Sequence, residues 1–317
     1  MFSRIPLLLA EVIFPLACLI AAGAVWKKIY ASEAQTLRQQ LNALILNVFS
    51  PALVFAVIAA TPLDVGLLRV PLLVAVGILV SGALVYLLLW HSPVGAGLGN
   101  GTRAALMICG MFGNVFFFGY PVLTFLFGPQ GGRYPAYIDL LGSIPLVWTL
   151  GVWVAVRLGG VRDVAPPSLL RVMAGLPPVW AFFLGLAYHA AGFGSTPLVT
   201  SLHWIGQTAI PLASFVLGLS IPWHALRPSR AILTVALVKL VAMPLAVFAF
   251  VAAASATPAE ADFAAIIEAA MPTMAMGVML ADRFKLDIDA AALITAWTTL
   301  LFCLTLPVWL MLLHLAT

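Results

Sequence analysis

The sequence predicts an all-helical membrane protein with ten membrane-spanning helices in two inverted five-helix repeats, the fourth and ninth helices being broken near their centres. Three observations predict this fold. Of the 317 residues, 63% are hydrophobic and 8% are charged, with a mean hydropathy of +1.12, whereas a soluble domain carries about 25% charged residues. The apolar residues gather into long segments. Two of these segments contain a central polar break.

Each apolar segment is close to the roughly 20 residues that a helix needs to cross a bilayer. Short connections rich in glycine and proline separate the segments, for example residues 93–101 and 128–132. None of the connections is long enough to form a soluble domain. We predict spans at residues 5–26, 40–60, 66–90, 103–128, 135–158, 170–193, 198–221, 230–254, 262–281 and 289–315.

The distribution of the 15 lysines and arginines predicts the orientation in the membrane. Only Arg4, Arg69 and Arg133 lie on the side of the termini, and Lys239 lies within the eighth span. The other eleven lysines and arginines follow the odd-numbered spans: Lys27, Lys28, Arg38, Arg103, Arg157, Arg162, Arg171, Arg227, Arg230, Arg283 and Lys285. These connections should therefore face the cytoplasm, and both termini should lie on the outer side of the cell's inner (plasma) membrane.

An internal repeat is indicated by residues that recur at nearly constant separation. The pairs are Pro51 and Pro211 at 160 residues, Pro145 and Pro307 at 162, and Gly113 and Pro272 at 159. Five spans per half place the halves in opposite orientations, as in inverted-repeat transporters. We predict a first repeat over 1–158, a short cytoplasmic linker over 159–169 and a second repeat over 170–317.

The polar breaks are the predicted binding site. They comprise Gly113 and Asn114 in the fourth span and Pro272 and Thr273 in the ninth. Half-helix ends offer partial charges for an anionic group and for a cation. The Asn114 amide can donate to a carboxylate and also satisfy freed backbone groups. Asn114 and Thr273 either contact the substrate or only cap the half-helices.

Two charges are predicted to lie deep in the membrane. At about 1.5 Å per residue, Lys239 and Pro272 both lie about 14 Å from the cytoplasmic ends of their spans. The Lys239 ammonium either takes the place of a sodium ion against the unwound carbonyls or extends to the cytoplasmic surface. Glu268 shares a face with Pro272. It either titrates during transport, pairs with Lys239 or faces the outer vestibule.

Polar residues on other spans are candidates to line the cavity that faces the breaks. They are Asn47 on the second span and Gln207 and Ser214 on the seventh. Each either contacts the substrate or makes a helix-to-helix hydrogen bond worth about 0.6 kcal/mol.

Other classes of function find no support in the sequence. There is no HExxH, GxSxG or phosphate-binding glycine loop and no Cys/His cluster. The net charge of +4 is explained by the cytoplasmic connections, so nucleic-acid binding has no basis. We therefore expect no enzymatic activity, catalytic residue, metal or cofactor.

Three stretches resemble the auxin efflux carrier family in its bacterial form, which is related to the plant auxin carriers. GNVFFFGYPVL at 113–123 is similar to the family's fourth-helix pattern, and MPTMAMGVMLADRFKLD at 271–287 to its ninth-helix pattern. LILNVFSPALVF at 44–55 extends the resemblance, which covers nearly the whole chain. Two features differ from the plant members of the family. The plant pattern has a proline where this chain has Gly113, and the long cytoplasmic loop between the fifth and sixth helices is reduced here to residues 159–169.

The resemblance implies a fold similar to sodium–proton antiporters and bile-acid symporters, with the fourth and ninth helices crossing near the membrane centre. It implies that helices 1, 2, 6 and 7 form a scaffold, against which helices 3–5 and 8–10 move. Bacterial relatives are associated with organic anions such as malate or malonate, and plant relatives with auxin, so the resemblance implies a malate-, malonate- or auxin-like carboxylate as substrate. We expect a secondary transporter of a small organic anion whose transport does not depend on sodium. The alternatives are a sodium-coupled symporter of the same fold and a channel or passive sensor. The oligomeric state, monomer or homodimer, stays open.

Overall fold

The structure is a computed structural model that describes residues 5–61, 65–160, 167–222, 227–254 and 257–315. Arg4 and Arg162 of the charge pattern lie outside these residues. The described chain is helical except for loops and an isolated antiparallel bridge between Gly113 and Thr273. Among the described residues, seven helical runs are long and apolar enough to cross a membrane: Ile5–Ile29, Ala31–Ala59, Gly66–His91, Pro129–Leu158, Pro197–Ser220, Arg230–Ala254 and Ile288–Leu313.

The first half of the chain is built from α-helices joined by short 3-10 and π-helical turns (η). Its elements are α1 (Ile5–Leu8), η2 (Leu9–Ile13), α2 (Phe14–Ile29), α3 (Ala31–Leu44), η3 (Ile45–Phe49), α4 (Ser50–Ala59), η4 (Val65–Leu68), α5 (Arg69–His91), η5 (Pro93–Gly95), α6 (Asn100–Met111), η6 (Val115–Gly119), α7 (Tyr120–Phe127), η7 (Pro129–Gly132), α8 (Arg133–Ile138), η8 (Asp139–Ser143), α9 (Ile144–Leu146), η9 (Val147–Gly151) and η10 (Val154–Leu158).

The second half has fewer π-helical turns among its described residues. Its elements are α10 (Leu169–Ala174), α11 (Pro177–Ala190), α12 (Pro197–Gly206), α13 (Ala209–Ser220), α14 (Arg230–Leu237), η12 (Val238–Ala242), α15 (Met243–Ala254), α16 (Glu260–Ala269), α17 (Met276–Arg283) and α18 (Ile288–Leu315).

The fourth, sixth and ninth predicted spans are interrupted, so none of them forms one of the seven long runs. The fourth is broken between α6 and η6, and the ninth between α16 and α17. The sixth is broken at Leu176, whose backbone is extended (φ −100°, ψ 108°). Pro177 follows Leu176, and a proline disfavours helical backbone in the residue before it.

The second span begins earlier than its hydropathy predicts. The helix starts at Ala31 rather than near residue 40. Residues 31–40 read ASEAQTLRQQ. They are too polar to be recognised as part of a span, but most of them are strong helix formers, so the helix continues through them.

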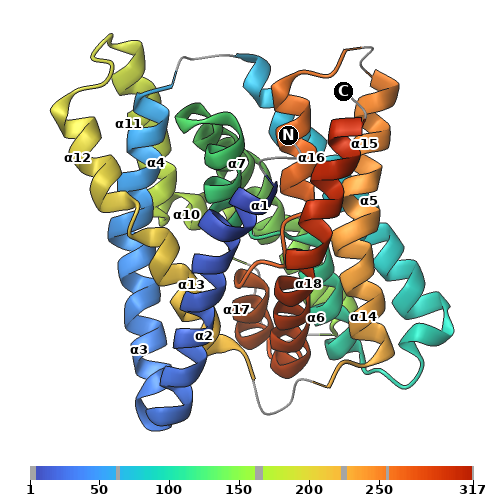
Figure 1. Ribbon diagram of the computed structural model, residues 1–317. Coiled ribbons are helices and arrows are strands. Elements are labelled where there is room, and N and C mark those ends of the chain that lie inside the picture. Colours follow the sequence, from blue (N-terminus) through green and yellow to red (C-terminus); the bar gives the residue numbers. More distant parts are fainter. Residues whose placement is uncertain (1–4, 62–64, 161–166, 223–226, 255–256, 316–317) are drawn as a thin grey trace.

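The helices pack into two groups (Figure 1). In the first group, α2 packs on α13, and α4 packs on α11 and α12. Gly23 and Gly218 allow α2 and α13 to approach closely, because a side chain at either would overlap the partner helix's backbone. In the second group, α5 contacts α6, α15 and α16, while α18 contacts α6 and α14. We call them the α2/α4/α11–α13 group and the α5/α6/α14–α18 group. We count α7 and α8 with the second group, because α7 contacts η6 and α8, and α8 contacts α5 and α16.

Candidate functional site

The two polar breaks meet inside the α5/α6/α14–α18 group. Gly113 and Thr273 form the antiparallel bridge. The Asn114 N–H donates to the Pro272 carbonyl at 2.6 Å, and the Met274 N–H donates to the Phe112 carbonyl at 3.1 Å. Each broken helix thus supplies partners for backbone groups that the other leaves unpaired, as the interior of a membrane protein requires.

Thr273 is committed to holding this contact. It is buried, and its hydroxyl donates to the Cys109 carbonyl at 2.9 Å. Its N–H donates to the Thr298 hydroxyl at 3.1 Å, and that hydroxyl in turn donates to the Ile294 carbonyl at 2.9 Å. Thr273 therefore joins the ninth segment to α6 and α18 through both of its donors.

Asn114 differs from Thr273, because its side chain remains available. Its backbone is not helical (φ −82°, ψ 64°), and its carbonyl accepts from the Phe118 N–H at 3.2 Å. The residue is partly exposed, and its side-chain amide makes no hydrogen bond within the described ranges. Gly113 and Pro272 are buried and contribute backbone only. The site therefore presents a free amide beside two half-helix ends.

Lys239 reaches the same place from η12. Its side chain is 0% exposed, and its ammonium donates to the Ala269 carbonyl at 2.8 Å. Nζ would lie 3.1 Å from a β-carbon built on Gly113, so the ammonium sits beside the break in the fourth segment. Ala269 is the last residue of α16, where the helix dipole favours a cation. The ammonium points to the meeting of the breaks rather than to a surface.

Glu268 lies one residue before Ala269 and is also 0% exposed. A side chain at Gly119 would overlap its carboxylate, so the carboxylate rests on the backbone of η6. Neither carboxylate oxygen has a hydrogen-bond partner in the described part of the chain. Nor does Glu268 form an ion pair with Lys239 there, although the two charges interact at longer range.

The three candidates on the other helix group are placed differently. Asn47 is exposed on η3 and donates to the Ala43 carbonyl of its own helix at 2.8 Å. Ser214 is buried and donates to the Ile210 carbonyl of α13 at 3.0 Å. Gln207 is exposed between α12 and α13. Because α13 contacts η6, Ser214 belongs to an element that borders the fourth-segment break, although its hydroxyl does not bond to it. Asn47 lies one element further away, on η3, which contacts α13.

One contact between the helix groups was not predicted. The Tyr120 hydroxyl on α7 lies 3.0 Å from Nε2 of His203 on α12. The sequence indicates no role for His203. A signal was present, since Tyr120 directly follows the glycine of the fourth-segment motif.

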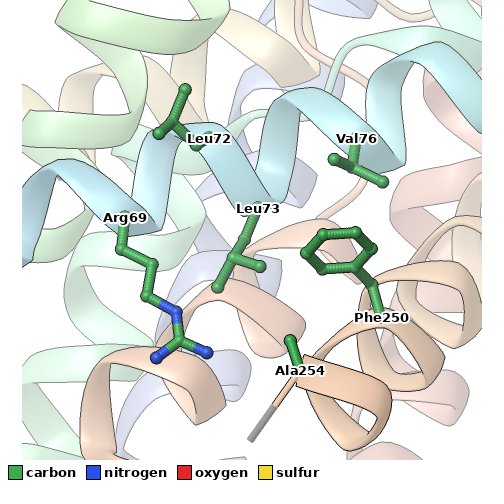
Figure 2. Close-up of a pocket in the computed structure, with 6 residues that line it drawn as sticks. All are labelled: Arg69, Leu72, Leu73, Val76, Phe250 and Ala254. Atoms are coloured by element: carbon green, nitrogen blue, oxygen red, sulfur yellow. The ribbon is translucent and has the colours of Figure 1, made fainter.

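Two shallow pockets lie away from the breaks. The first, of about 340 Å³, lies between α5 and α15 and is apolar except for one arginine (Figure 2); its lining residues are Arg69, Leu72, Leu73, Val76, Phe250 and Ala254. The second, of about 360 Å³, has charged residues in its lining, among them Arg133 and Glu260. Neither is lined by a residue of the breaks.

Comparison with known proteins agrees with these features. The family described as membrane transport protein matches residues 8–163 and 161–310. An uncharacterized transporter of Methanothermobacter thermautotrophicus is 28% identical over 272 residues, covering 85% of this chain and 87% of that protein. An uncharacterized transporter of Methanocaldococcus jannaschii is 25% identical over 307 residues, covering 94% and 97%. The chain is a multi-pass membrane protein that belongs to the membrane transport protein family, the auxin efflux carrier family that its sequence resembles.

Proposed function

We propose that this protein is a secondary transporter that binds a small organic carboxylate where its two broken helices meet. The free amide of Asn114 carries the proposal, because it is a polar side chain without an internal partner at a site where the surrounding backbone groups are paired. A carboxylate would accept from this amide near the N-terminal end of the half-helix that follows. Gly113, Pro272 and Thr273 shape the site around it.

The proposed architecture has ten spans in two inverted repeats, 1–158 and 170–317, joined by the linker 159–169. It is supported by the two family matches, which divide the chain near residue 162. Of the linker, residues 161–166 lie outside the described ranges. The proposed location is the inner membrane, and the charge pattern supports an orientation with both termini outside. Asn47, Gln207 and Ser214 would line the opposite wall of the substrate path.

The proposed mechanism is an elevator-type movement of the α5/α6/α14–α18 group against the α2/α4/α11–α13 group. The separate packing of the two groups supports it, since helices contact their own group most extensively. Breaks that are held together by backbone hydrogen bonds would move as one body. The substrate would then travel with them.

Coupling is proposed to be independent of sodium. The Lys239 ammonium already supplies a positive charge at the C-terminal end of α16, which is where a bound cation would be stabilised. A sodium-coupled symporter of the same fold is the alternative. Replacing sodium with a bulky organic cation during uptake into proteoliposomes separates the two, since only the symporter would stop.

A thermal-shift series on the purified protein tests the proposal. A ligand that binds only the folded state stabilises it by about 2.7 kcal/mol at 100 times its dissociation constant. We expect malonate, malate or another member of a series of mono- and dicarboxylates to raise the Tm, and the neutral diamide of the same acid to leave it unchanged. No rise with any carboxylate would contradict the proposal. A large unitary conductance in bilayers would favour a channel.

A further inference from the structure

Glu268 is a buried carboxyl group whose surroundings provide no donor. Its side chain is 0% exposed, and both oxygens lack a hydrogen-bond partner among the described residues. An isolated carboxylate in an apolar interior costs several kcal/mol or more, and intramembrane acids that persist are usually functional. The burial of Glu268 without a hydrogen-bond donor therefore calls for an explanation in the function of the site.

The backbone that Glu268 rests on gives its carboxylate oxygens no hydrogen-bond donor within the described ranges. The carboxyl rests against Gly119, the last residue of η6. Pro121 follows two residues later and has no N–H, so the turn before it lacks one hydrogen-bond donor. A protonated Glu268 would have an O–H to donate to a carbonyl of this turn. An ionised Glu268 would have nothing to accept from.

Two charged groups act on Glu268 from neighbouring elements. They are the Lys239 ammonium on η12 and the Asp139 carboxyl on η8. Lys239 is bonded to the Ala269 carbonyl rather than to Glu268. Asp139 is partly exposed. A metal ion is a poor fit, because no group of three or more His, Cys, Asp or Glu side chains is gathered anywhere in the described ranges.

Several charged and phenolic groups on the helices around α16 are engaged elsewhere. Arg69 on α5 pairs with Asp262 at 3.1 Å. On α8, the Tyr134 hydroxyl donates to Glu260 at 2.8 Å and accepts from Arg133. Tyr120 on α7 contacts His203. Residues 243–254 of α15 contain no ionisable side chain.

We propose that Glu268 is a proton-binding site and that the carrier moves a proton together with its organic anion. The proton adds to one carboxylate oxygen, forming a neutral acid, and leaves from the same oxygen on the other side of the membrane; no other bond changes. Protonation makes the site one unit more positive, which favours an anion at Asn114. The transport step rests on the proposed carboxylate carrier, whereas proton binding to Glu268 does not.

Infrared spectroscopy of the reconstituted protein, without substrate, tests proton binding directly. The chain has four glutamates, and labelling their carboxyl carbons with ¹³C identifies the C=O band of a protonated glutamate. We expect such a band to disappear as the pH is raised and to be missing from Glu268→Gln. Glu260→Gln is the matched control, because Glu260 lies on the same helix with its side chain 47% exposed, and it should keep the band. If the labelled wild type shows no C=O band of a protonated glutamate that disappears as the pH is raised, the proposal is overturned.

Uptake of radiolabelled malate into proteoliposomes tests the coupling. In the wild type and in Glu260→Gln, acid outside should raise accumulation several-fold over equal pH, and a sodium gradient at equal pH should not. In Glu268→Gln, uptake with acid outside should equal uptake at equal pH, so their ratio should fall to unity. A ratio unchanged in Glu268→Gln, or a sodium gradient that replaces the proton gradient, would overturn the proposal. If no carboxylate enters wild-type vesicles, the carrier proposal fails, and the infrared band alone decides whether Glu268 binds a proton.

Discussion

Lys239 places a positive charge where the two broken segments meet. Its ammonium is bonded to the Ala269 carbonyl and lies beside Gly113. The sequence placed Lys239 at the depth of Pro272 by counting residues along two spans, and the structure puts the ammonium at the same break. The sequence left open whether the side chain extends to the surface, since helical rise gives depth but not direction.

Lys239→Met tests this charge, because methionine keeps the length of the side chain and removes the ammonium. A hydrogen bond to a charged group contributes about 1.5–3 kcal/mol, so we expect a lower Tm in choline chloride. Sodium chloride should restore part of the loss in the variant and leave the wild type unchanged. Arg227→Met, at an exposed residue in a connection, is the control and should keep the wild-type Tm in both salts. A variant as stable as the wild type in both salts would contradict the proposed role.

Among the elements, the meeting of the fourth and ninth segments is held mainly by backbone hydrogen bonds and by Thr273. The sequence predicted both breaks, because glycine and proline in long apolar segments are conspicuous. It did not predict that the Thr273 hydroxyl is engaged, since the Cys109 carbonyl that accepts it lies 164 residues away. Such a contact depends on packing between helices and leaves no periodic pattern.

Thr298→Val should loosen this meeting point. Valine keeps the shape of threonine but leaves the Thr273 N–H without its buried acceptor, which costs about 1–3 kcal/mol. Thr299→Val is the matched control, because the Thr299 hydroxyl donates only to the Thr295 carbonyl of its own helix. Denaturation in detergent should show a larger loss for Thr298→Val. Equal losses would mean that the bond to Thr273 contributes nothing of its own.

For the whole molecule, the contact between Tyr120 and His203 joins the two helix groups. The sequence predicted a division into these groups only through the family resemblance. It did not predict this contact, because the two residues are 83 positions apart on different segments. If the groups move against each other, this hydrogen bond must break in each cycle.

Tyr120→Phe should therefore change the rate of the movement. Removing one hydrogen bond of about 0.5–1.5 kcal/mol corresponds to a roughly two- to tenfold change in an equilibrium or a rate. Tyr188→Phe is the control, because the Tyr188 hydroxyl bonds to Thr196 within the α2/α4/α11–α13 group. Exchange of a labelled carboxylate across vesicles measures the rate. Equal rates in the wild type and both variants would mean that this contact does not limit the movement.

The central claim is that a carboxylate binds at Asn114, and the affinity of purified Asn114→Ala for a carboxylate tests it most directly. The ligand is the carboxylate that raises the wild-type Tm most, titrated by calorimetry. We predict at least a tenfold loss of affinity in Asn114→Ala, since a charge-assisted hydrogen bond contributes about 1.5–3 kcal/mol. Asn42→Ala, an exposed asparagine on α3, should bind as the wild type does. A folded Asn114→Ala with wild-type affinity would contradict the account and place the site elsewhere.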